Sequence, residues 1–205
     1  MPITRLSLAR TLAAALALLA GVSTAPGRSE AVEAPSGGNE RSERGGLIPA
    51  RADALTDALD AVNRKDYPRA VQLLEPLARK GNPSAQLQLG QLYYHGHGVR
   101  ENDAQALRWF ERAARQGLAD AQFQLANMYA YGLARPPGKQ DAARVAAQWT
   151  FEAARQGHAQ AAYSLGIMFL TGSGVVRDDA EGRRWIEKAA EGGHADAKTY
   201  LTQAK

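Results

Sequence analysis

The chain has 205 residues, of which 45% are hydrophobic, 22% charged and 7% aromatic, as in one or two globular units. This composition excludes a collagen, a coiled-coil rod and a fully disordered chain. The formal net charge is +4, and basic residues are interleaved with acids, so we predict no nucleic-acid partner. The lack of cysteine excludes a disulfide, a thiolate nucleophile, a cysteine-ligated zinc site and a lipidated cysteine.

Residues 1–25 have the features of a secretory signal peptide. They contain two arginines and no acid, with an apolar run from Leu12 to Val22 and small residues before Pro26. This run is too short to cross a membrane core, which takes about 20 residues in a helix. We therefore expect export, with cleavage near Pro26 and no membrane anchor afterwards. An organelle transit peptide is the alternative, although such segments are amphipathic.

The next two segments differ sharply in composition. Residues 26–50 are rich in glycine, proline, serine and charge, which predicts a disordered linker, or alternatively a tail that folds on a partner. Residues 51–80 predict two helices that form an N-terminal helical hairpin, capping the array that follows. Pro76 lies inside the second of these helices and is expected to kink or shorten it.

The remainder of the chain is an internal repeat. Similar segments begin at four glycines: Gly81, Gly117, Gly157 and Gly193. Their spacings of 36, 40 and 36 residues define the units 81–116, 117–156 and 157–192 and a terminal half repeat, 193–205. The extra residues of the middle unit fall at Arg135 to Gln140, where two prolines and a glycine predict a lengthened turn.

Each unit is predicted to form two helices. Apolar residues recur at helical spacing on the first helix and should face the core. These positions are Ala85, Leu89, Leu92 and Tyr93, then Ala121, Leu125, Met128 and Tyr129, then Ala161, Leu165, Met168 and Phe169. Gly90 and Gly166 recur inside the same helices, where glycine costs about 1 kcal/mol relative to alanine, so we predict close approach of a neighbouring helix.

The second helix of each unit carries a tryptophan followed by two alanines: Trp109, Trp149 and Trp185 lead these motifs. Gly117, Gly157 and Gly193 should end the second helices. One helix pair cannot cover its own apolar side, so neighbouring pairs must stack. The predicted fold is all-α, a right-handed α-solenoid of stacked helix-turn-helix repeats.

The motif A-x-x-x-L-G-x-x-Y-x-x-G-x-G-V, followed by A-x-x-W-x-x-x-A-A-x-x-G, resembles the Sel-one-like repeat, a relative of the tetratricopeptide repeat. The resemblance covers Gly81 to Lys205. The middle unit departs from it, since Ala126 replaces the helix glycine and Ala134 and Arg135 replace the Gly-Val of the turn. That departure leaves the conformation of the middle loop open.

The resemblance implies a non-catalytic protein-protein interaction module in a bacterial periplasm, with secretion as the alternative location. Such a module acts as an adaptor, regulator or inhibitor and binds a protein or peptide partner in the envelope. One alternative is an immunity protein that neutralises a phospholipase-type secreted effector. A less favoured alternative is an envelope hydrolase that acts on peptidoglycan or a β-lactam. Neither the partner nor the oligomeric state follows from the sequence.

We predict no catalytic residue, no cofactor and no metal site. The chain lacks nucleophile-elbow, zincin, Walker and dinucleotide-binding motifs. His95 and His97 suggest a metal pair, but the equivalent residues of the other units are not strong ligands. His158 and His194 follow helix-ending glycines, which indicates a role in the repeat framework. Asp178, with the adjacent Asp179, precedes a second helix and is expected to cap it.

The predicted binding surface is a mostly polar stripe beside the apolar one on the first helices. The resemblance implies that first helices line the concave side of the solenoid. The candidate residues are Gln88, Gln91, Tyr94, Gln124, Asn127, Tyr131, Ser164 and Ile167, flanked by Ser84, His95, Asp120, Gln160 and Thr171. Tyr94, Tyr131 and Ile167 are the expected anchors. The alternative is a face that is only solvated, and the loop Arg135 to Gln140 is a second candidate for recognition.

Overall fold

The computed structural model describes residues 53–203, which form nine α-helices and no β-strand. The helices are α1 (Asp53–Asn63), α2 (Tyr67–Arg79), α3 (Pro83–His95), α4 (Asp103–Arg115), α5 (Ala119–Ala130), α6 (Ala142–Arg155), α7 (Ala159–Thr171), α8 (Asp179–Glu191) and α9 (Ala195–Gln203). The predicted signal peptide, 1–25, and linker, 26–50, lie outside the described residues. No helix within 53–203 has the length and apolar character needed to span a membrane.

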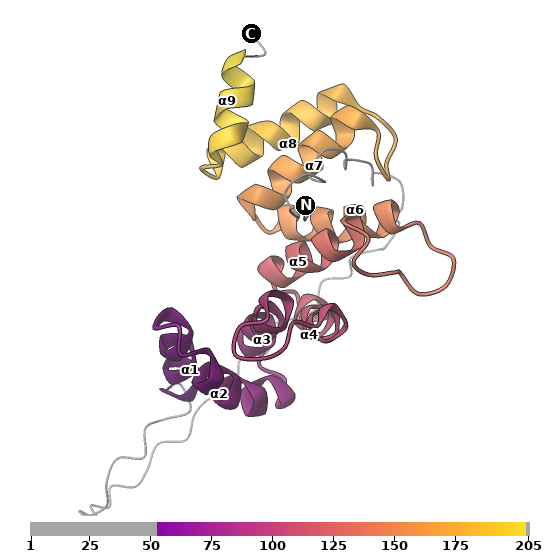
Figure 1. Cartoon of the computed structure of the whole chain (residues 1–205). Coiled ribbons are helices and arrows are strands. Elements are labelled where there is room, and N and C mark those ends of the chain that lie inside the picture. The colour runs from indigo at the N-terminus through magenta and orange to yellow at the C-terminus, as the bar shows by residue number, and fades with distance from the viewer. Residues whose placement is uncertain (1–52, 204–205) are drawn as a thin grey trace, which may run out of the picture.

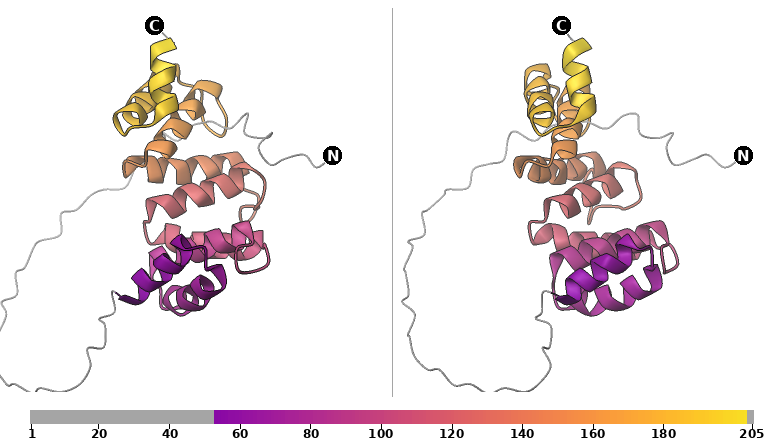
Figure 2. Two further views of the ribbon diagram at one scale, coloured as in Figure 1. Left: turned by 60° about the vertical axis from the view of Figure 1, so that its left-hand side comes forward. Right: turned by 90° about the vertical axis from the view of Figure 1, so that its left-hand side faces the viewer.

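The helices pair into hairpins that follow one another along an elongated stack (Figures 1 and 2). Hairpin α1/α2 begins the stack, α3/α4, α5/α6 and α7/α8 follow, and α9 ends it. Each helix packs chiefly against the helices before and after it in the sequence. Burial therefore depends on neighbouring hairpins, which is the defining property of a solenoid. The predicted all-α solenoid of helix-turn-helix repeats is confirmed.

The second helices end as the sequence indicates. Gly81, Gly117, Gly157 and Gly193 all have φ between 85° and 94°, in the left-handed region. After α4, the amide of Gly117 donates to the carbonyl of Ala114 (3.0 Å) and the amide of Leu118 to that of Ala113 (3.3 Å). This pair of hydrogen bonds closes a helix and requires a residue that tolerates positive φ.

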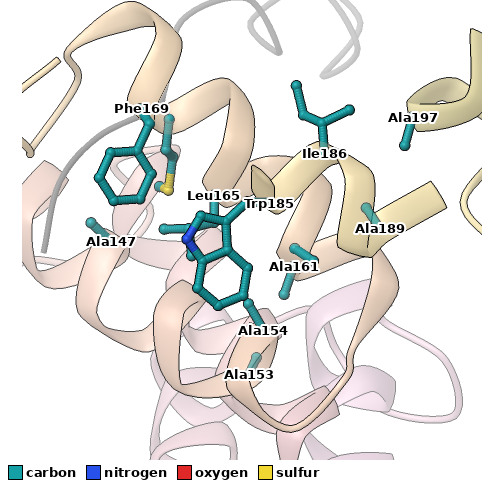
Figure 3. Close-up of a cluster of buried hydrophobic side chains, with 12 residues drawn as sticks. Ala147, Ala153, Ala154, Ala161, Leu165, Phe169, Trp185, Ile186, Ala189 and Ala197 are labelled. Carbon is teal, nitrogen blue, oxygen red and sulfur yellow. The ribbon is translucent and has the colours of Figure 1, made fainter. Parts of the chain in front are cut away.

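The predicted core positions on the first helices are buried in all three units. Of the twelve, eleven expose 4% or less of their surface, and Tyr93 alone is half-buried. In the third unit, Leu165 and Phe169 of α7 pack with Trp185 and Ile186 of α8 and with alanines of α6 (Figure 3). The small alanines leave space that the large side chains of the neighbouring helices fill.

Gly90 and Gly166 lie directly against the second helix of their own hairpin. A Cβ atom on Gly90 would lie 2.6 Å from the Phe110 ring, and one on Gly166 would lie 2.5 Å from Cγ1 of Ile186. The close approach predicted from these glycines is confirmed. The middle unit has Ala126 in the glycine position and the smaller Thr150 in the position of Phe110, and both are buried.

Two details of the backbone differ from the prediction or complete it. Helix α2 is not shortened by Pro76, because the helix continues to Arg79 and the proline lies on its exposed side. In the first and third turns, Gly98 and Gly174 adopt positive φ, whereas Ala134 at the equivalent position of the middle unit does not.

The middle turn takes a different course because alanine avoids positive φ. Its left-handed residue after Gly132 is instead Gly138, within the additional residues. The resulting long connection between α5 and α6 extends away from the stack (Figure 1). Ala134 itself is buried, with 8% of its surface exposed.

Candidate functional site

The eight predicted binding residues lie on the first helices α3, α5 and α7 or directly after them. None is part of the buried core: Tyr131 is 47% exposed and the other seven are half-buried. The side chains of Gln88, Gln91, Gln124, Asn127 and Ser164 form no hydrogen bond with any other residue in 53–203. We call this stripe, from Gln88 to Ile167, the first-helix face.

The first-helix face is almost free of charge. Asp120 is the single acidic or basic residue other than histidine in α3, α5 and α7. In contrast, each of α2, α4, α6 and α8 carries three or more charged residues. Several of these form ion pairs within one helix, such as Arg79 with Glu75 (2.9 Å) and Arg183 with Glu187 (3.3 Å). The charged side chains therefore belong to the second helices, and the first helices present neutral polar groups.

Two other glutamines of the first helices are buried and hydrogen-bonded, a feature that the sequence analysis missed. Gln86 is 3% exposed; its Nε2 donates to the carbonyl of Ala78 (3.0 Å), and its Oε1 accepts from Gln116 (2.8 Å). Gln122 repeats this arrangement in the next unit, where it bonds the Ala114 carbonyl (3.2 Å) and Gln156 (2.7 Å).

Gln86 and Gln122 join α3 and α5 to the last helix of the preceding hairpin, and they also join each of these helices to the end of its own hairpin, at Gln116 and Gln156. The pair Gln86 and Gln116 recurs at equivalent positions as Gln122 and Gln156, and this recurrence is the sequence signal that could have identified the hydrogen-bonded glutamines. The third unit replaces both, with Ala162 and Gly192. An apolar pair is an acceptable substitute, because removing both members of a buried hydrogen bond leaves no unsatisfied group.

His158 and His194 connect successive first helices. Nδ1 of His158 accepts from the amide of Ala161 (3.1 Å) and caps α7, while its Nε2 lies 3.3 Å from Oδ1 of Asp120. Nδ1 of His194 accepts from the amide of Ala197, and its Nε2 lies 2.8 Å from Oε1 of Gln160. Asp120 and Gln160, from the flank of the stripe, therefore contact the next repeat.

His95 and His97 lie in a cluster of stacked rings. The His97 ring stacks on Tyr67, with centroids 4.4 Å apart and planes 13° apart, and on His95 at 5.5 Å. Within residues 53–203, no group of three or more histidine, aspartate or glutamate side chains is placed to hold a metal ion. The observed contacts of His97 are those of an aromatic packing residue.

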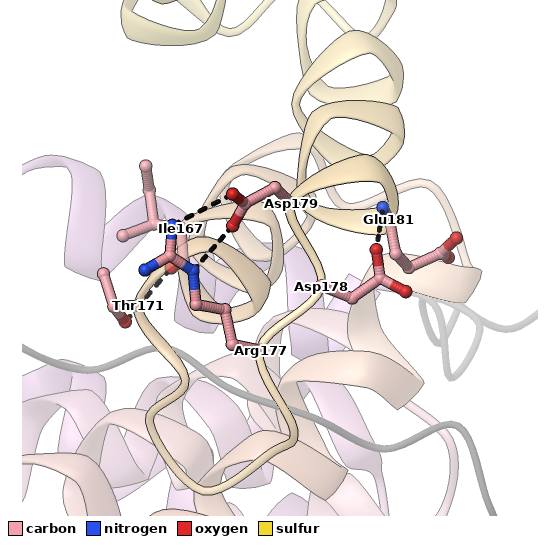
Figure 4. A network of polar contacts seen from close by, with 6 residues as sticks. All are labelled: Ile167, Thr171, Arg177, Asp178, Asp179 and Glu181. Carbon is pink, nitrogen blue, oxygen red and sulfur yellow. Dashed lines mark hydrogen bonds and ion pairs between the residues drawn. The ribbon is translucent and has the colours of Figure 1, made fainter.

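Asp178 and Asp179, for which the sequence predicts helix capping, lie between the turn after α7 and the start of α8 (Figure 4). Oδ1 of Asp178 accepts from the amide of Glu181 (2.9 Å), which caps α8 as expected. Asp179 instead forms two hydrogen bonds with Arg177 (2.8 and 2.9 Å), and these bonds lower the pKa of its carboxyl. Both aspartates are therefore engaged locally, and their geometry is that of a helix start.

Tyr129 lies in the core below the first-helix face. Its hydroxyl donates to Oε1 of Glu111 on α4 (3.2 Å), and 4% of its surface is exposed. Burial, together with the neighbouring Glu111 carboxylate, raises the pKa of Tyr129 to about 12. The tyrosine therefore joins α5 to α4 of the preceding hairpin as a neutral hydrogen-bond donor.

The repeats match a known family. The family model of the Sel1 repeat matches residues 60–82, 83–118, 119–158 and 159–194. The chain belongs to the Sel1 repeat family. Sel1 repeat proteins generally mediate protein-protein interactions, and their fold is typically a non-catalytic interaction scaffold. No match to a curated protein was found.

Two solved structures support the same assignment. A Sel1 repeat protein from Oxalobacter formigenes is 34% identical, with a TM-score of 0.64, over 71% of this chain and 56% of that one. The protective antigen c5321 from uropathogenic Escherichia coli, which displays an SLR fold, is 30% identical with a TM-score of 0.66. That match covers 74% of this chain and 32% of c5321. The chain thus spans about half and about a third of these two relatives.

Proposed function

We propose that this Sel1 repeat protein is an exported, non-catalytic module that binds a partner protein in the bacterial envelope as an adaptor, regulator or inhibitor. The observation that carries the proposal is the first-helix face, where uncharged side chains recur over three successive hairpins. The leader at 1–25, with its short apolar run, supports export to the periplasm.

The first-helix face has the groups that a protein partner requires. Four of its side chains are amides: Gln88, Gln91, Gln124 and Asn127. These amides retain their hydrogen-bonding capacity, since none of them forms a hydrogen bond with another residue in the described part of the chain. Tyr131 adds a large, exposed aromatic surface at the end of α5, and aromatic residues often dominate binding energy at interfaces. A neutral polar face with an exposed tyrosine favours binding of protein over binding of a charged polymer.

Photo-crosslinking in cells tests the binding surface. A photoreactive amino acid is placed at Asn127 or Tyr131 on the first-helix face, and at the exposed Gln72 or Gln148 on the second helices as controls. We expect a discrete crosslinked protein from the first-helix positions and none from the control positions. Crosslinks from the controls alone would refute the assignment of the surface.

Fractionation tests the location separately. We expect the chain in the periplasmic fraction, with an N-terminus at or near Pro26 after removal of the leader. A cytoplasmic chain that retains residues 1–25 would overturn the proposed export but leave the crosslinking result intact.

A further inference from the structure

We propose that the turn between α5 and α6 is a second contact surface of this protein and that it docks against an acidic surface of the partner protein. This turn, residues 131–144, is called the basic turn below. The inference rests on the proposed function, that the chain binds a protein, and it assigns a further surface and the charge of the partner there.

The basic turn projects from the stack (Figure 1). A Cβ atom on Gly132 or Gly138 would meet no atom within 4 Å. In the first turn, by contrast, a Cβ atom on Gly98 would lie 2.5 Å from the carbonyl carbon of Tyr67 in the preceding hairpin. These parts of the basic turn are therefore not covered by a neighbouring hairpin. Loops that project from a rigid scaffold commonly carry binding residues.

The basic turn carries three cations without a partner. Arg135, Lys139 and Arg144 are exposed, and their side chains form no ion pair or hydrogen bond with another residue in 53–203. The one acid of the turn, Asp141, accepts a hydrogen bond from the amide of Ala143 (2.8 Å) and caps α6. With three basic residues and one acid, residues 131–144 have a net charge of +2.

The other two turns have the opposite net charge. The equivalent segments 95–104 and 171–180 each contain one arginine and two acids, which gives −1 with neutral histidines. In the third turn, Arg177 pairs with Asp179 (2.8 Å). Among the three turns, a positive net charge is thus confined to the middle one. Because protein interfaces place opposite charges against each other, the basic turn favours an acidic partner surface.

Exposed apolar side chains border the basic turn. Tyr131 and Val176 are the large hydrophobic residues exposed in the described part of the chain, at 47% and 77%. Tyr131 begins the basic turn, and Val176 belongs to the turn after α7. That turn packs on the start of α6, since a Cβ atom on Gly174 would lie 2.5 Å from the carbonyl carbon of Ala143. Apolar anchors beside charged groups are the usual composition of a protein interface.

The number of cations favours a protein over a lipid surface. Basic segments that bind anionic membranes carry clusters of about four to eight lysines and arginines. The basic turn has three, and Asp141 lies among them. We therefore assign an acidic protein surface to this turn and include lipid vesicles in the test.

Peptide selection supplies a defined acidic probe. Random peptides displayed on phage are selected against the exported chain, and the enriched sequences are synthesised with blocked ends and a fluorescent label. We expect enrichment of aspartate and glutamate, and binding that weakens at least about fivefold between about 50 and 500 mM NaCl, because salt screens exposed charges. Enrichment of neutral or basic sequences, or no enrichment, would overturn the inference.

Matched charge-reversal variants locate the binding on the molecule. Arg135→Glu with Lys139→Glu reverses two charges of the basic turn, and Lys80→Glu with Lys198→Glu reverses two exposed, unpaired cations elsewhere. We expect the first pair to weaken binding of the acidic peptides at least about tenfold and the second pair to change it less than about twofold. Thermal unfolding confirms that both variants fold. Equal losses in both would refute the assigned site.

Vesicles of phosphatidylcholine, with and without phosphatidylglycerol, test the membrane alternative. We expect the exported chain to sediment with neither. Sedimentation with the anionic vesicles that Arg135→Glu with Lys139→Glu abolishes would overturn the inference in favour of a lipid surface. A partner crosslinked at Asn127 with a yield that the same variant leaves unchanged would leave the proposed function standing and remove only this inference.

Discussion

Replacing Gly90 with alanine tests how closely the helices of one hairpin approach. The new Cβ would lie 2.6 Å from Cε1 and 2.7 Å from Cδ1 of Phe110. Phe110 is 1% exposed, so its ring cannot turn away into solvent. The helices must separate or the ring must leave its preferred rotamer, and either response disturbs a close-packed interior.

The expected magnitude follows from two opposing contributions. Overpacking of a core costs about 1–3 kcal/mol, while alanine stabilises a helix interior by about 1 kcal/mol relative to glycine. Because two buried ring atoms obstruct the methyl group, we take the upper part of the first range. The variant should lose about 1–2 kcal/mol of unfolding free energy, which lowers the melting temperature by about 2–8 °C in a domain of this size.

The middle unit supplies the compensating change, since Thr150 stands where the first unit has Phe110. Phe110→Thr alone should cost about 3–4 kcal/mol, because it removes a buried ring. In that background the methyl group of Gly90→Ala no longer meets a ring, so the substitution should stabilise the protein by about 1 kcal/mol. The effect of Gly90→Ala therefore changes sign, which corresponds to a coupling of about 2–3 kcal/mol.

Urea unfolding followed by far-UV circular dichroism measures all four members of this cycle. Ala126→Gly is the control: it should lose about 1 kcal/mol, since the middle unit has no clash to relieve. If Gly90→Ala has the same effect with and without Phe110, the close approach does not limit packing and the reasoning is wrong.

Three further predictions concern the turns, the buried amides and the core tyrosine. Gly174→Ala should destabilise the fold more than Gly193→Ala, because its Cβ would lie 2.5 Å from a backbone carbon whereas Gly193 faces open space; thermal unfolding compares the two. Gln122→Ala should cost about 1–3 kcal/mol in urea unfolding, since it removes one buried and one partly buried hydrogen bond. An unchanged midpoint would show that these bonds add nothing. In an ultraviolet titration, Tyr129 should ionise near its pKa of about 12. The pKa of Tyr129 in the folded protein lies above the unfolded value of about 10. The neutral tyrosine therefore contributes stability that is present below pH 10 and is lost as pH rises towards 12. Tyr129→Phe should remove that part of the pH dependence.

The sequence was sufficient to predict the fold because each structurally important residue pattern occurs in several repeat units. The spacing of Ala85, Leu89 and Leu92 indicates one buried helix face, and its recurrence identifies the stacked unit. Gly90 also indicated a tertiary contact, since the cost of a glycine inside a helix must be offset by close packing of a neighbouring helix. The shortening predicted at Pro76 was wrong, because a proline on an exposed helix side removes one hydrogen bond without ending the helix; the kink stays a prediction.

The candidate site was less accessible to sequence reasoning. Gln86 and Gln88 are the same residue type two positions apart on one helix, yet the first is buried and bonded and the second is half-buried. Hydropathy does not distinguish them, because the distinction depends on where the preceding hairpin presents its carbonyl groups. The role of Asp120 in contacting His158 likewise depends on how two units stack.

The side chains that meet between the two helices of a hairpin are matched in size, and this limits which segments can be exchanged between repeats. Glycine faces phenylalanine in the first unit and isoleucine in the third, and the equivalent positions of the second unit hold alanine and threonine. A chimaera that exchanges one helix would combine mismatched sizes, either a clash or a void. A chimaera that exchanges a whole hairpin keeps the matched pair together. The hairpin, rather than the single helix, is therefore the smallest segment that can be transplanted between positions in this array.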